Sequence, residues 1–198
     1  MPVRVQHVAG KLPMGDNPLE AVYSFVERAY MRLQAGDILI RCLEEGNASP
    51  MHQMVEALVL AGPQSLNSLQ EILSEVGRRK SQVLDDLHQV FNDLQNNLKK
   101  HGVRLTGINN ALLVTRLSSL NFLAMLREQG ITENQAQIDC MQLLKDSKEL
   151  IINLAAHLNL LDEIENYLQD WVWGLAYQSA HQDFNNPGVK PSDINRQH

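Results

Sequence analysis

The longest regular pattern in the sequence is a heptad of apolar residues between about residues 64 and 100. Spacings of three and four place these side chains on one stripe of an α-helix, as is typical of helices that pack as coiled coils. Lys80 is the one polar residue in the stripe. A charged side chain there either fixes helix register or oligomeric state, or lies at the edge of the seam with its ammonium group in water. The stripe consists of Leu66, Leu69, Leu73, Val76, Lys80, Val83, Leu87, Val90 and Leu94.

Two shorter helices are predicted before this long one. The pair Asn17–Pro18 has the form of an N-cap followed by a first helical residue, and Gly46 is placed to end that helix. The pair Ser49–Pro50 repeats the start signal, and the second helix ends before Gly62. The first helix also carries apolar residues at spacings of three and four, namely Val22, Val26, Ala29, Leu33, Ile40 and Leu43, with Gly36 filling the one gap.

The second half of the chain is also predicted to be helical. After a turn at residues 106–110, one helix is expected to reach residue 129. Its stripe consists of Leu113, Leu117, Leu120, Ala124 and Arg127. Thr132 and Gln135 have the spacing of a capping box, which predicts the start of a last helical region extending to about residue 182. Asn159 or Asp162 could cap a further helix inside it, so the sequence leaves open whether this region forms one helix or two.

These patterns predict an all-α fold, an elongated antiparallel bundle of about five or six helices with long coiled-coil-like members. We expect a single domain over residues 18–182. Proline and glycine interrupt residues 1–17, which predicts a flexible N-terminal arm. Residues 183–198 have few apolar side chains with which to offset the entropy of ordering, so a disordered tail is expected there.

Composition narrows the classes of function. Hydrophobic residues make up 44% of the sequence and aromatic residues only 5%, which favours helices over sheets. A net charge of −6 argues against a nucleic-acid partner, because such proteins need a basic surface. No run approaches the ~20 apolar residues of a transmembrane segment, and no secretory signal is recognisable. A cytoplasmic location is therefore expected, with export without a cleavable signal peptide as the alternative.

The candidate chemistry is sparse. Asp85 and His88 stand one helical turn apart, but a metal site needs at least three protein ligands, so an exposed polar face is the preferred interpretation. Cys42 and Cys140 lie among apolar neighbours, where a thiol behaves as a small buried hydrophobe. We therefore expect no catalytic residue, metal or other cofactor, and no enzymatic activity.

The residues chosen as candidates for partner binding are aromatic, apart from Lys80. Trp171 and Trp173 are expected to point about 200° apart on a helix, so only one of them can face the core. Exposed tryptophan is enriched at the energetic centres of interfaces. The predicted partner-binding residues are Trp171, Trp173, Tyr177 and Lys80.

The sequence alone therefore favours a non-enzymatic helical protein that binds a protein partner or associates with itself. An adaptor, an assembly factor, a chaperone and a structural component all belong to this class. Two alternatives stay open. One is a secreted tip, translocator or effector protein of a secretion system, and the other is a helical ligand-binding or sensory bundle.

Overall fold

The computed structural model describes residues 18–62 and 65–184, and within these ranges it contains six helices and no strand. The predicted arm at residues 1–17 lies outside the described residues. So does the predicted tail at 183–198, except for its first two residues, which belong to the last helix. The all-α prediction is confirmed. The helices are α1 (Pro18–Glu45), α2 (Ser49–Leu60), α3 (Ser65–Lys100), α4 (Ala111–Arg116), α5 (Ser119–Glu128) and α6 (Asn134–Phe184).

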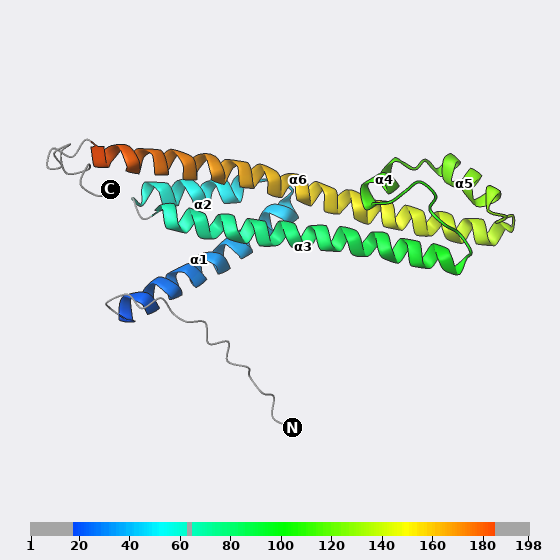
Figure 1. The fold of residues 1–198 in the computed structure, drawn as a ribbon, viewed down its shortest axis with the longest axis horizontal. Coiled ribbons are helices and arrows are strands. Elements are labelled where there is room, and N and C mark those ends of the chain that lie inside the picture. The colour runs from blue at the N-terminus through cyan, green and yellow to red at the C-terminus, as the bar shows by residue number, and fades with distance from the viewer. Residues whose placement is uncertain (1–17, 63–64, 185–198) are drawn as a thin grey trace, which may run out of the picture.

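Helices α3 and α6 lie side by side and run in opposite directions along the molecule (Figure 1). Two buried clusters hold them together. One joins the first half of α3 to the region around Ile164 of α6 and includes residues of α1 and α2. The other joins the second half of α3 to the region around Leu144 and includes residues of α4 and α5. Leu154 and Leu158 pack against both clusters, so the apolar core is continuous along the pair.

Helix α6 is a single helix of 51 residues, which settles the question that the sequence leaves open. At ~1.5 Å per residue it is about 75 Å long. The predicted capping box is wrong. The helix begins at Asn134, and the side-chain amide of Gln135 donates to Asp139 Oδ1 at 2.8 Å instead of completing a cap with Thr132.

The single helix expected before residue 129 is also wrong, because the chain forms two short helices there. Leu117 has an extended backbone with ψ 111°, and the Ser118 hydroxyl accepts a hydrogen bond from the Asn121 amide at 3.1 Å, which starts α5. Lys148 of α6 donates to the Leu117 carbonyl at 2.8 Å. A local cap and a long-range donor therefore satisfy the backbone groups that the break leaves without helical partners.

Lys80 connects α3 to α6. Its ammonium group pairs with Asp162 Oδ1 at 2.6 Å and with Glu165 Oε2. Hydrogen bonds to Asp162 and then to Glu165 raise the pKa of Lys80. The polar position in the heptad of α3 is thus matched by two carboxylates of the same chain, whereas binding of a partner by Lys80 stays a prediction.

We expect Lys80→Met to lower the free energy of unfolding at pH 7 by about 1 kcal/mol, since Asp162 is half-exposed and water screens part of the attraction. The folded-state pKa of Lys80 lies above the ordinary 10.5, so this stabilisation is fully present below pH 10.5 and is lost as the pH rises through the folded-state pKa. Denaturant titrations at neutral and strongly alkaline pH measure both effects.

The matched control is Lys145→Met, which removes an exposed lysine of α6. Equal losses of stability in the two variants at neutral pH would contradict the role assigned to Lys80. A deficit that persists at a pH above the folded-state pKa of Lys80 would contradict it as well.

Candidate interaction surface

Helix α1 has two apolar faces on different sides. The inner face, centred on Ala35, Leu39 and Cys42, is buried against the bundle. The second face is the stripe predicted from the sequence without Leu43, which packs against the core, and it lies roughly 130° around the helix from the first. We call it the outer face of α1 and define it as Val22, Val26, Ala29, Leu33, Gly36 and Ile40, flanked by Tyr23, Phe25 and Tyr30.

The outer face is exposed along its length. Leu33 is 70% exposed and Phe25 is 59% exposed, whereas Leu39 on the inner face is 1% exposed. Figure 1 shows the reason, because the first half of α1 diverges from the bundle and no other helix lies over its far side. A stripe with coiled-coil spacing is therefore left without a helix to pack against in the described part of the chain.

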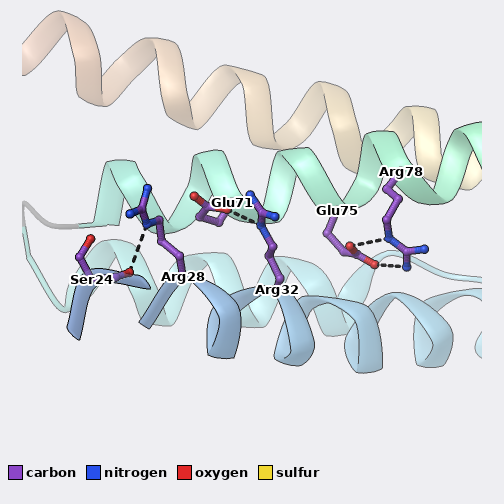
Figure 2. Close-up of polar contacts among 6 residues, drawn as sticks. All are labelled: Ser24, Arg28, Arg32, Glu71, Glu75 and Arg78. Carbon is purple, nitrogen blue, oxygen red and sulfur yellow. Dashed lines mark hydrogen bonds and ion pairs between the residues drawn. The ribbon is translucent and has the colours of Figure 1, made fainter. Parts of the chain in front are cut away.

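Polar contacts join α1 to α3 beside this face (Figure 2). Arg32 Nε donates to Glu71 Oε2 at 2.5 Å. This is the ion pair in the close-up that joins the two helices directly. Arg28 donates within its own helix to the carbonyl oxygen of Ser24 at 3.1 Å. The first half of α1 is therefore joined to α3 by this ion pair, and Met31 is its apolar residue that packs against the core.

A groove of about 700 Å³ runs between the outer face and α3. Phe25, Leu33 and Ile40 are among its apolar lining, and the opposite wall contains Glu71, Glu75 and Arg78 of α3. A Cβ atom added at Gly36 would lie 3.6 Å from Glu75 Oε1, an ordinary contact distance. Because glycine has no side chain, the groove is deeper at this position.

Glu75 and Arg78 on the α3 wall of the groove pair with each other. Glu75 is 8% exposed, and its carboxylate accepts hydrogen bonds from Arg78 Nε at 2.8 Å and Nη2 at 2.5 Å. The hydrogen bonds from Arg78 to Glu75 raise the pKa of the arginine, so the guanidinium stays charged. The two hydrogen bonds fix the orientation of the Arg78 guanidinium on helix α3, where it lines the groove.

The aromatic residues proposed from the sequence lie elsewhere, near the C-terminal end of α6. Trp171 is half-buried and packs edge-on against Tyr167, with ring centroids 6.4 Å apart. Trp173 is 76% exposed and Tyr177 is 65% exposed. Only one tryptophan faces the core, as expected, and binding of a partner by Trp171, Trp173 or Tyr177 stays a prediction.

The residues weighed for chemistry are not brought together. Asp85 and His88 are both exposed on α3, and the described residues contain no group of three or more potential metal ligands. Cys42 and Cys140 are buried, which confirms the prediction for them, and burial raises the pKa of both thiols. A thiol with a raised pKa is a weak nucleophile at neutral pH. In the described ranges, no helix is both long and apolar enough to cross a membrane.

A second groove, of about 850 Å³, lies between α5 and α6 at the other end of the molecule. Leu123, Ile138, Met141 and Ile152 supply apolar lining, and Arg127 and Lys145 supply positive charge. The sequence analysis did not identify this groove, because it depends on the break between α4 and α5.

The two faces of α1 provide a matched pair of substitutions. Leu39→Ala is expected to lower the free energy of unfolding by about 2–5 kcal/mol, because it opens a cavity in the core. Leu33→Ala in dilute protein is expected to change it by less than about 0.5 kcal/mol, as at other exposed sites. Urea titration of both variants measures this contrast, and similar losses would show that Leu33 is buried in solution.

Comparison of the chain with family models, curated proteins and solved structures gives no match.

Proposed function

We propose that this chain is a non-enzymatic helical interaction protein that binds a helix of a protein partner along the outer face of α1. The observation that supports this is the exposure of a heptad stripe from Val22 to Ile40. Exposed apolar patches on soluble proteins mark interaction sites, whereas single exposed apolar residues need no explanation.

The shape of the outer face favours a helix as the bound element. Side chains at spacings of three and four form a straight strip, about 27 Å long from Val22 to Ile40, that matches the apolar strip of a second helix. A helix seated there would bury the strip on one side and meet the charged α3 wall of the groove on the other. Apolar side chains bind by releasing water and supply no general acid, base or nucleophile, which fits binding better than catalysis.

Site-specific photo-crosslinking tests this proposal. A photoreactive phenylalanine analogue is placed at Leu33 on the outer face, and the matched control carries it at Leu84, an apolar residue of α3 that is 43% exposed. Irradiation of cells that contain the protein is expected to give a discrete cross-linked species from position 33, because a bound helix would lie within bonding distance there.

Position 84 is expected to give little or no such product. Equal labelling at both positions, or no cross-linked protein from position 33, would count against the proposal.

The groove between α5 and α6 favours a second candidate function, that of a helical ligand-binding bundle. Its apolar lining and its three cations, Arg127, Lys145 and Lys148, against the one carboxylate of Glu149, suit an amphipathic anion such as a fatty acid. Thermal-shift assays with dodecanoate and, as the uncharged match, dodecanol test this candidate. No stabilisation by either compound would remove its support.

A further inference from the structure

We infer that the helix bound by the outer face of α1 is the same helix of a second copy of this chain. In this pairing the two α1 helices form a parallel two-stranded coiled coil. The inference rests on the proposed function and deepens it by identifying the partner. Its support comes from the seam, the flanking charges and the area available for burial.

The seam of the outer face is suited to pairing with its own copy. In heptad terms Val26, Leu33 and Ile40 occupy one core position and Val22, Ala29 and Gly36 the other. In a parallel pair, each residue meets the same residue of the second copy across the helix axis. Large and small side chains then alternate along the seam, and the exposed Ala29 lets the two backbones come close, whereas Glu75 of the same chain borders Gly36.

The residues that flank the seam are complementary in a parallel pair. In a parallel coiled coil, a residue on one side of the core seam lies opposite the residue five positions later on the second helix. This rule places Arg32 opposite Asp37 and Phe25 opposite Tyr30, and symmetry produces each pair twice. An antiparallel pair would instead bring the arginine flanks of the two copies together, so the charges select the parallel arrangement.

The groove has no net charge, since Arg28, Arg32 and Arg78 are balanced by Asp37, Glu71 and Glu75, so attraction of an acidic residue depends on individual N–H donors. Arg32 bonds Glu71 through Nε, and a guanidinium has further N–H donors on its terminal nitrogens. Asp37 of the second copy would therefore accept from the terminal nitrogens of Arg32.

The area is sufficient for a specific dimer. Three aromatic side chains and four aliphatic ones on the outer face are each 41% to 71% exposed. With roughly 200 Å² for an aromatic side chain and about 100 Å² for an aliphatic one, two copies would bury about 1,200 Å². Specific interfaces begin at about 1,200 Å², and contacts between the second copy and α3 add to the seam. The seven side chains are Val22, Tyr23, Phe25, Val26, Tyr30, Leu33 and Ile40.

A charge-exchange experiment on the full chain tests the inference. Sedimentation velocity over a concentration series is expected to show a dimer for the unmodified chain and a monomer for Leu33→Glu, with Leu84→Glu as the dimeric control. Arg32→Glu and Asp37→Arg, each alone, turn two attractive pairs into repulsive ones. Each should raise the dissociation constant roughly tenfold or more. An equimolar mixture of the two variants restores both attractive pairs and should form heterodimers with near-original affinity.

The fold of each variant is checked by its circular dichroism and melting curve, because Arg32→Glu also removes the pair with Glu71. A dimer that Leu33→Glu leaves intact, or folded variants that do not recover on mixing, would overturn the inference. A monomer whose position 33 still cross-links to a different protein would overturn self-pairing and leave the proposed function standing. A monomer with no cross-link would overturn both.

Discussion

The antiparallel contact between α3 and α6 supports every other helix, since each of the shorter ones packs against at least one of the two. Most buried side chains come from this pair or point toward it. Leu154 and Leu158 join the two clusters into one core, so the order at one end depends on the other. Lys80 adds a polar contact to this apolar seam and fixes the alignment of α3 with α6 through Asp162 and Glu165.

The local stability of each half of α1 depends on how far that half lies from this pair. Its second half reaches the core through Leu39 and Cys42, but its first half meets α3 mainly through polar groups such as the Arg32–Glu71 pair. Exposed ion pairs contribute little to stability. A helical segment with few buried apolar contacts opens locally at low cost, and burial of its outer face by a partner is what would stabilise it.

The ends of most helices could be predicted from the sequence, because Pro18, Gly46 and Gly102 act through local backbone geometry. The break at Leu117 could not, since the apolar stripe continues through it and Lys148, the donor to the Leu117 carbonyl, lies 31 residues away. The exposure of the outer face of α1 could not be predicted for a related reason. Both faces of α1 are apolar, and periodicity identifies a face without saying which one the rest of the chain covers. The carboxylates that pair with Lys80 lie about eighty residues away, beyond any local pattern.

Amide hydrogen exchange along α1, measured at low and at high protein concentration, tests the central claim most directly. If the outer face pairs with a second copy, amides between Tyr23 and Leu33 should exchange rapidly in dilute protein and become protected as the concentration rises. Amides in the middle of α3 should be protected equally in both conditions. Exchange along α1 that does not change with concentration would contradict the account.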